Sequence, residues 1–112
     1  MVHEQLITRS SEIPYTQLDD KVKRRVLAHS AQLMLVEVVM ETGGVGTVHS
    51  HPHSQNTYVL SGRFRFTMNG QELEVAAGDT LAFLPSVPHG TLCLEAGTLL
   101  DVFSPMREDF LL

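Results

Sequence analysis

The sequence predicts an all-β fold, namely a small barrel of two sheets in a single domain. Proline and glycine punctuate short runs of branched and apolar residues, and no segment has a long helical period. Apolar and polar residues alternate in several of these runs, as they do in half-buried strands. The length of 112 residues suits one domain. About eight or nine runs can be counted, which is enough for a double-sheet barrel whose mouth holds a ligand.

The chain opens with a polar, irregular stretch, and we expect residues 1–20 to form an N-terminal arm ahead of a barrel over 21–112. The arm is predicted to contain one short strand around Leu6–Ile7 and a loop through Pro14. The first strand of the barrel is predicted over Val22–His29. The basic side chains near it are expected to form a solvated face. They are Lys21, Lys23, Arg24 and Arg25.

The run Leu33–Met40, LMLVEVVM, is apolar on both faces except at Glu37. Such a strand is covered by the core on one side and by a partner on the other. We therefore expect a homodimer whose contact lies on the outer face of this strand, with Val38 as a contact residue.

The clearest alternation follows in Arg63–Val75, where apolar and polar side chains take turns. The expected inward residues are Phe64, Phe66, Met68, Leu73 and Val75. Asn69–Gly70 is typical of a two-residue hairpin turn, because both residues tolerate positive φ. Three further turns are predicted: at Gly62, at Gly78–Asp79 before a strand over Thr80–Leu84, and at Glu95–Gly97 before the last strand, Thr98–Phe103.

The stretch Gly43–Gly62 contains the segment HSHPHSQ, which has three histidines and a glutamine. Residues two apart in a strand point to the same side, so His49 and His51 can direct their imidazoles to one point. His89 lies in LPSVPHG, between two apolar runs, and is the expected ligand from a distant part of the chain. His-rich tracts also bind metals on composition alone, but recurrence at two distant places favours a specific metal site. His53 lies outside this spacing.

Composition argues against several partners and compartments. A formal net charge of -5 and a pI near 5.6 give no reason to expect nucleic acid. No stretch reaches membrane-spanning length and the N-terminal residues lack the apolar run of a signal peptide, so we expect a cytoplasmic protein without a membrane partner. The single cysteine, Cys93, excludes an internal disulfide, and its alternating surroundings indicate packing rather than nucleophilic chemistry.

The last predicted strand carries a carboxylate. Its alternation places Leu99, Asp101 and Phe103 on one face. Burying an unpaired charge is costly, so an inward Asp101 is paired, bound to a ligand or retained for chemistry. A salt bridge or a turn-capping role is the alternative to a functional one.

The histidine spacing resembles the two motifs of the cupin superfamily, whose members are double-stranded β-helix or jelly-roll barrels. The first motif, G-x5-H-x-H-x3-E-x6-G, is matched by Gly43, His49, His51, Gln55 and Gly62, with glutamine replacing glutamate. The second, G-x5-P-x-G-x2-H-x3-N, is matched in part. Its positions correspond to Gly78 and His89, with Pro85 one place late, Val87 where glycine is usual and Cys93 where asparagine is. The resemblance implies one divalent metal ion bound by His49, His51, Gln55 and His89.

A closer resemblance extends from about Val22 to Leu111, carried by RRVLAH, HSHPHSQNTYVLSGRF, VPHGTLCLEAGTLLDVFSP and REDFL. These segments are similar to the small KdgF-type cupins of pectin and alginate breakdown. The resemblance implies metal-dependent conversion of a 4,5-unsaturated monouronate, an anionic sugar acid, to linear 4-deoxy-5-hexosulose uronate. It also implies that Asp101 is the catalytic residue and that Phe103 and Arg107 contact the substrate.

The implied fourth ligand, Gln55, bears on the alternatives. Three imidazoles and an amide are neutral, so a divalent cation keeps its full charge, which favours an anionic substrate and Lewis-acid chemistry. Such ligands do little to stabilise oxidised iron, which argues against a cupin-type dioxygenase. That class stays open, as does a non-catalytic sugar-acid-binding protein. These ligand types accept nickel, zinc, manganese or iron.

Overall fold

The computed structural model describes residues 6–112 of the chain. These residues contain eight strands and two short 3-10 helices. In chain order they are η1 Ser10–Glu12, β1 Thr16–Gln17, β2 Val22–Ser30, β3 Leu33–Met40, β4 Val45–His49, β5 Ser54–Met68, β6 Gln71–Ala76, β7 Thr80–Phe83, β8 His89–Ser104 and η2 Glu108–Leu111. The predicted all-β fold is confirmed. No helix within residues 6–112 has the length and apolarity that a membrane crossing requires.

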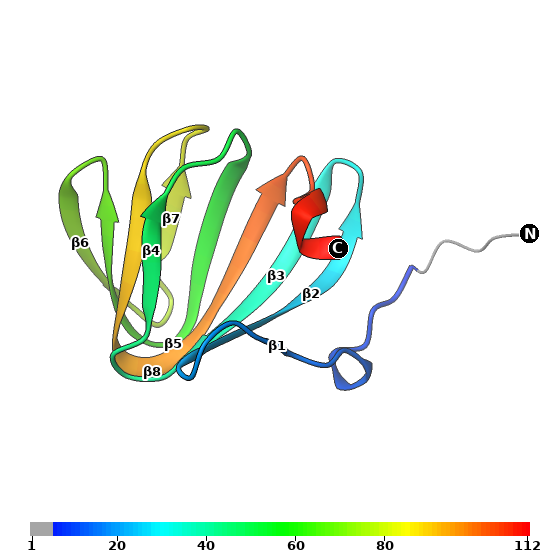
Figure 1. Ribbon diagram of the computed structural model, residues 1–112, viewed down its shortest axis with the longest axis horizontal. Coiled ribbons are helices and arrows are strands. Elements are labelled where there is room, and N and C mark those ends of the chain that lie inside the picture. The colour runs from blue at the N-terminus through cyan, green and yellow to red at the C-terminus, as the bar shows by residue number, and fades with distance from the viewer. Residues whose placement is uncertain (1–5) are drawn as a thin grey trace, which may run out of the picture.

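β5 and β8 run through both sides of the barrel, because each is long, bent and paired with different neighbours in its two halves (Figure 1). The first half of β5 pairs with β7 and with the second half of β8, beyond which β3, β2 and β1 extend the sheet. The second half of β5 pairs with β6 and with the first half of β8, which is bordered by β4. Two facing sheets therefore share the same two central strands.

The bends in these strands lie at Gly62 and Gly97, where we predicted chain-reversing turns, and both of those predictions are wrong. Gly62 has φ 84, and a Cβ added to it would lie 2.6 Å from the carbonyl oxygen of Glu95. A Cβ on Gly97 would overlap the carbonyl group of Ser61. The glycines allow the two backbones to bend and touch within continuous strands.

The predicted hairpin between β5 and β6 is confirmed. Asn69 and Gly70 have φ values of 48° and 82°, as a two-residue turn of this type requires. Leu73 pairs with Phe66 in the expected register. Because β6 is an edge strand, Leu73 nevertheless stays 38% exposed.

Each of the turns on either side of β7 also contains a residue with a positive φ, that is, with left-handed backbone conformation. Gly78, with φ 94, occupies the predicted turn before the strand. In the loop before β8 the left-handed residue is Ser86, with φ 64, rather than Val87. The motif spacing, counted back from His89, also puts its glycine at position 86, so the assignment of that position to Val87 is wrong and Ser86 occupies it.

Alternate residues of β3 point into the barrel. Met34, Val36 and Met40 are buried, and Val38 packs against the same core. Val38 lies an even number of positions from these buried residues, so it faces the same side of β3 as they do. The prediction that Val38 lies on an outer contact face is therefore wrong. The remaining buried apolar side chains are Val22, Val59, Phe64, Phe66, Phe83, Cys93, Leu99 and Phe103. Burial raises the pKa of the Cys93 thiol, in keeping with a packing role.

The N-terminal arm covers part of the outer face of β2 and β3. Arg25 of β2 pairs with Glu37 of β3 at 3.0 Å and donates to the carbonyl oxygen of Ser10 at 2.9 Å. The strand predicted at Leu6–Ile7 is wrong, because these residues pair with no strand and are 89% and 60% exposed. The arm instead pairs with β2 through β1. Residues 1–5 of the expected arm lie outside the described residues.

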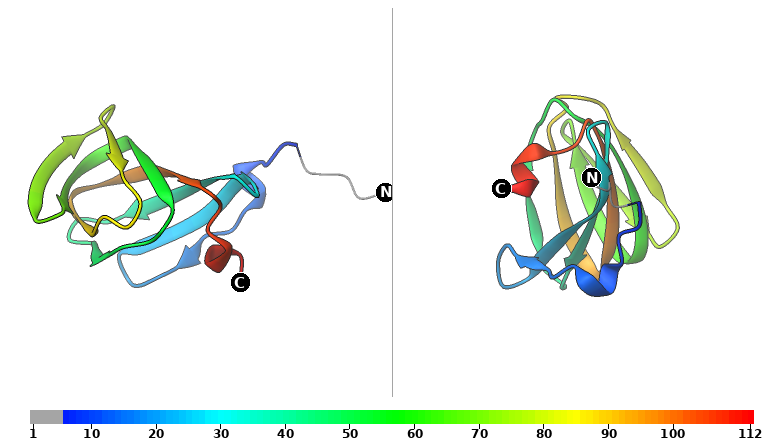
Figure 2. Two further views of the ribbon diagram at one scale, coloured as in Figure 1. Left: turned by 90° about the horizontal axis from the view of Figure 1, so that it is seen from above. Right: turned by 90° about the vertical axis from the view of Figure 1, so that its right-hand side faces the viewer.

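The C-terminal segment folds back beside β2, as Figures 1 and 2 show for η2. The amide of Met106 donates to the carbonyl oxygen of Ala31, in the turn between β2 and β3, at 3.2 Å. Phe110 of η2 meets Phe103 of β8 edge to face, with ring centroids 5.7 Å apart. This packing brings Arg107, just ahead of η2, to the edge of the barrel interior.

Candidate functional site

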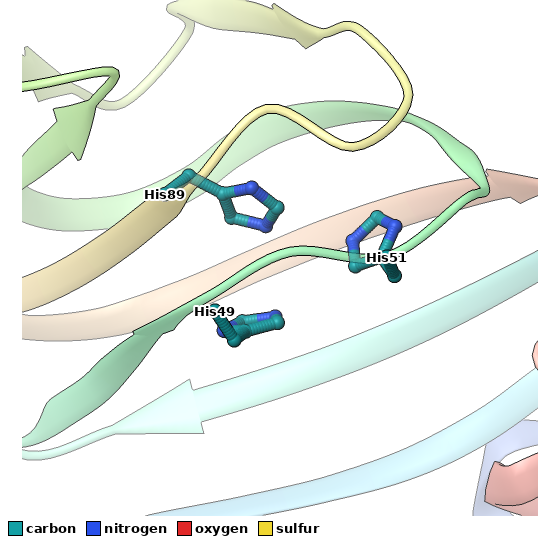
Figure 3. A group of neighbouring side chains, drawn as sticks. All are labelled: His49, His51 and His89. Carbon is teal, nitrogen blue, oxygen red and sulfur yellow. The ribbon is translucent and has the colours of Figure 1, made fainter.

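Three histidines from two distant stretches of the chain meet at one end of the barrel (Figure 3). His49 ends β4, His89 begins β8 and the two are cross-strand partners, while His51 lies in the loop before β5. One nitrogen from each ring lies within 4.8 Å of the others. His51 and His89 are buried and His49 is exposed. The cluster is compatible with a single metal site.

The backbone fixes the proton of each imidazole. Each Nδ1 faces a carbonyl oxygen: that of Thr47 at 2.7 Å for His49, of His53 at 3.1 Å for His51, and of Val87 at 2.9 Å for His89. A neutral imidazole has one proton, so these contacts place it on Nδ1 and leave the Nε2 lone pairs for a ligand. Nε2 of His89 is buried and has no hydrogen-bond partner within residues 6–112. A bound cation would satisfy this atom.

Gln55 extends the cluster through its side-chain oxygen, 3.0 Å from Nε2 of His51. Its amide nitrogen donates to the Thr57 hydroxyl at 3.0 Å, and Thr57 donates to Asp101 at 2.7 Å. Since Thr57 gives its only proton to the carboxylate, it must accept from the amide nitrogen, which leaves the amide oxygen facing His51. The lone pairs of the Gln55 amide oxygen and of Nε2 of His51 then face each other unless a cation lies between them. The donor set therefore fits a metal ion.

Burial lowers the pKa values of His51 and His89 below the ordinary value of 6.5. An imidazole must be neutral to bind a metal, so burial keeps these side chains competent at neutral pH. The donors come from both sides of the barrel, because His49 and His89 lie on paired strands of one sheet and Gln55 on the other.

Asp101 points into the barrel, on the same face of β8 as the buried Leu99 and Phe103. Burial raises the pKa of its carboxyl to about 6, and hydrogen bonding from Thr57 and Gln55 opposes this rise only in part. Such a carboxyl can both release and accept a proton near neutral pH. We did not single out Thr57 from the sequence, although its place two residues after Gln55 puts it on the same inward face.

Phe103 and Arg107 border the same pocket. Phe103 is 3% exposed, and its ring centroid lies 5.6 Å from that of His51. Arg107 lies over the ring of Phe110 at 4.2 Å, and its Nε and Nη2 donate to Asp109 at 3.1 and 2.9 Å. A guanidinium has five N–H donors, so a second edge of Arg107 stays available to a ligand.

Arg24 also enters the pocket, and the expectation that it lies on a solvated face is wrong. Arg24 lies two positions after the buried Val22, so its side chain faces the same side of β2. The central carbon of its guanidinium group lies 3.7 Å from the ring centroid of Phe110. Lys23, one residue earlier, lies instead over Tyr15 on the outer face. The sequence around Arg24 shows its spacing from Val22 but not the ring that it contacts, because that ring comes from the far end of the chain.

The pocket has a volume of about 200 Å³. Sites for drug-sized ligands measure roughly 300–1,000 Å³, so this one suits a single small molecule. Its polar lining consists of Thr91 and the groups described above: Arg24, His49, Gln55, His89, Asp101 and Arg107.

Comparison with known proteins identifies a family and several relatives. The sequence profile of the cupin domain matches residues 36–103, a stretch that includes the three clustered histidines. The chain is 38% identical over 102 residues to the pectin degradation protein KdgF of Dickeya dadantii, and the alignment covers 89% of this chain and 93% of that protein.

Two solved structures resemble this one over nearly the whole chain. An RmlC-like cupin from Shewanella frigidimarina has a TM-score of 0.91 at 34% identity and covers 96% of both chains. KdgF from a Halomonas species has a TM-score of 0.88 at 31% identity, with coverage of 95% of this chain and 98% of that one.

Proposed function

The chain belongs to the cupin domain family, and we propose that it is a metal-dependent enzyme that opens and ketonises 4,5-unsaturated monouronates. Its similarity to a pectin degradation protein points to sugar acids as the substrate class. The product is the linear 4-deoxy-5-hexosulose uronate. The reaction is an isomerisation, so it needs no oxidant or second substrate.

The observation that carries this proposal is the series of contacts from His51 to Gln55 and then, through hydrogen bonds, from Gln55 by way of Thr57 to Asp101. It holds a carboxyl that titrates near pH 6 next to the proposed metal ligands, in a pocket sized for one small molecule. An enzyme that moves one proton between two positions of a bound sugar needs such a group.

The chemistry assigns Asp101 two proton transfers. The substrate is a cyclic hemiacetal whose ring oxygen is attached to the C4=C5 double bond. As a base, Asp101 takes the C1 hydroxyl proton; C1 becomes a carbonyl, the bond from C1 to the ring oxygen breaks, and its electron pair stays on that oxygen as an enolate. As an acid, Asp101 then returns a proton to C4, and C5 becomes a ketone.

The other side chains bind the substrate and the metal. A divalent ion held by His49, His51, Gln55 and His89 would supply Lewis-acid stabilisation of the enolate charge, and nickel, zinc, manganese and iron all suit these donors. Arg107, fixed by Asp109, offers its remaining edge to the substrate carboxylate. Phe103 supplies an apolar wall next to His51.

An NMR assay tests the reaction, with the vinylic C4 proton of an unsaturated monouronate as the signal. We expect the metal-loaded protein to accelerate loss of this signal over the spontaneous rate and a chelator to abolish the acceleration. Asp101→Asn should keep fold and metal but lose about 10²- to 10⁴-fold in kcat. Asp20→Asn, which changes an exposed carboxylate, should have no effect.

The outcomes also separate the alternatives. Wild-type protein that leaves the signal at the spontaneous rate would refute the proposal. Oxygen consumption in that case would indicate a dioxygenase, and tight uronate binding without product would indicate a sensor. An Asp101→Asn variant as active as wild type would remove Asp101 from the mechanism.

We further propose that the chain forms a homodimer through the start of β3. Leu33 is 50% exposed and, with Leu6 and Leu35, lines an apolar groove of about 640 Å³. An apolar surface of this kind on a small protein favours a contact with a second copy. Light scattering should give a dimer mass that Leu33→Lys reduces and Gln32→Lys leaves intact. A monomer mass for wild type at micromolar concentration would overturn the idea.

A further inference from the structure

Arg24 is a cation in the pocket to which the proposed reaction assigns no role. Its central carbon lies 3.7 Å from the ring centroid of Phe110, and that of Arg107 lies 4.2 Å from the same centroid. Arg107 is paired with Asp109. Arg24, by contrast, forms no ion pair with any residue of the described range 6–112.

The two guanidinium groups leave an excess of positive charge at this end of the pocket. Burial and the nearby charge of Arg107 both lower the pKa of Arg24, so the neighbourhood disfavours its charged form. Asp109 is one carboxylate for two cations, and Asp101 is already bonded to Thr57. The whole chain carries a net charge of -5, so this excess is local. A bound anion would offset it.

We propose that Arg24 and Arg107 together bind the carboxylate of the sugar acid, with Arg24 as the unpaired partner that sets specificity for an acid over a neutral sugar. This inference rests on the proposed function for the identity of the ligand. Both guanidinium groups contact the ring of Phe110 and both residues line the same pocket, where each would contact the carboxylate at N–O distances of roughly 2.8 Å. Arg107 uses its second edge, and Arg24 uses donors that have no acceptor within residues 6–112.

The arrangement also orients the sugar. With its carboxylate at the two arginines, the sugar ring would lie in the pocket that Asp101, His49 and His89 also line. The alternative is that Arg24 only packs on Phe110 as a cation over an aromatic ring. A packing role predicts a loss of stability but no preference between charged and neutral ligands.

Binding of an unreactive ligand distinguishes these roles. Galacturonate, which lacks the double bond, and neutral galactose can be titrated calorimetrically into the metal-loaded protein. Arg24→Gln should weaken galacturonate binding about tenfold or more, since hydrogen bonds to a charged partner are among the stronger ones, and should leave galactose unchanged. Lys23→Gln is the matched control, because it removes the same charge one residue away on the outer face.

Turnover provides an independent readout. If Arg24 binds substrate and transition state alike, Arg24→Gln should raise KM for the unsaturated uronate with kcat nearly unchanged. Arg24→Lys keeps the charge and should recover part of the loss. The side-chain Nε resonance of Arg24 in wild type should shift on addition of galacturonate but not of galactose, a measurement that requires no variant to fold.

Equal galacturonate affinity in Arg24→Gln and wild type would overturn the inference, as would an equal loss in Lys23→Gln or an unshifted Nε resonance. If galacturonate binding depends on Arg24 but no unsaturated uronate is turned over, the inference holds and the proposed reaction fails. If turnover occurs and Arg24→Gln leaves KM unchanged, the reaction holds and the inference fails. Wild-type protein that binds no uronate would refute both.

Discussion

Replacing Asp101 by asparagine should make the metal-free protein more stable relative to wild type as the pH rises toward neutrality. Burial raises the pKa of the Asp101 carboxyl from its ordinary value of 3.8 to about 6. A carboxyl whose pKa is higher in the folded state supports folding fully below pH 3.8, and this support is lost as the pH rises through about 6. Above that pH the folded protein holds a carboxylate that water would solvate better. Asparagine removes the charge and still accepts the hydrogen bond from Thr57.

The size of the effect follows from the pKa difference. About two pKa units correspond to about 3 kcal/mol of unfolding free energy at 1.36 kcal/mol per unit. About 2 kcal/mol of this develops between about pH 4.5 and 7.5, because the carboxyl of the unfolded chain is already partly ionised at the lower pH. The unpaired amide of asparagine carries its own cost, but that cost does not depend on pH and cancels from the comparison.

Urea unfolding with a chelator present, for wild type and Asp101→Asn at both pH values, measures this difference. We expect the variant to gain about 2 kcal/mol relative to wild type on going from the lower to the higher pH. Asp109→Asn is a control that should show almost no such change, because pairing with Arg107 lowers the pKa of Asp109 below its ordinary value of 3.8 and its ionised form already supports folding at both pH values. A stability difference between wild type and Asp101→Asn that does not change with pH would refute the reasoning.

Three further changes test other parts of the site and fold. His49→Ala combined with His89→Ala should abolish stoichiometric metal binding in untagged protein, measured by elemental analysis; retained metal would place the site elsewhere. In wild type, occupancy should persist to a pH somewhat below 6.5, because burial lowers the pKa of His89. Thr57→Val should keep metal and KM but lower kcat about tenfold, and Thr57→Ser should restore it; an unchanged kcat would show that Asp101 needs no such support. Gly97→Ala should lower the free energy of unfolding, measured with urea, by more than ~2 kcal/mol. Gly70→Ala, whose added Cβ meets open space, should lower it by only ~1 kcal/mol. Equal losses would contradict crowding at the strand crossing.

The histidine cluster was predictable because part of its geometry is local. His49 and His51 are two positions apart near the end of a strand, and this spacing alone allows a shared direction. The motif spacing supplied the link to His89. The backbone carbonyl oxygens that fix the protons, and Thr57 between Gln55 and Asp101, require knowledge of which strands are adjacent.

The bends at Gly62 and Gly97 could not be distinguished from turns by local sequence. Glycine after an apolar run indicates a departure from regular strand geometry in either case. The choice depends on whether another backbone passes within contact distance, as those of Ser61 and Glu95 do here. That contact joins residues more than thirty positions apart in the chain.

Arg24 shows the same limit for side chains. Its position two residues after Val22 is visible in the sequence and would have placed it inside the barrel. Its charge and its basic neighbours favoured the opposite interpretation. The packing of Phe110 against it, from the C-terminal segment, is what makes an inward arginine tolerable.

The proposed metal donors belong to two sheets that the chain connects directly at the bends of β5 and β8, seen at the lower edge of Figure 1. An ion held by His89 on one sheet and Gln55 on the other is therefore a crosslink between their separate ends. Removing it frees the rim of the barrel to open while the strand crossing at Gly62 and Gly97 stays closed. Metal loss should accordingly appear first as faster amide hydrogen exchange around the rim, ahead of any global unfolding.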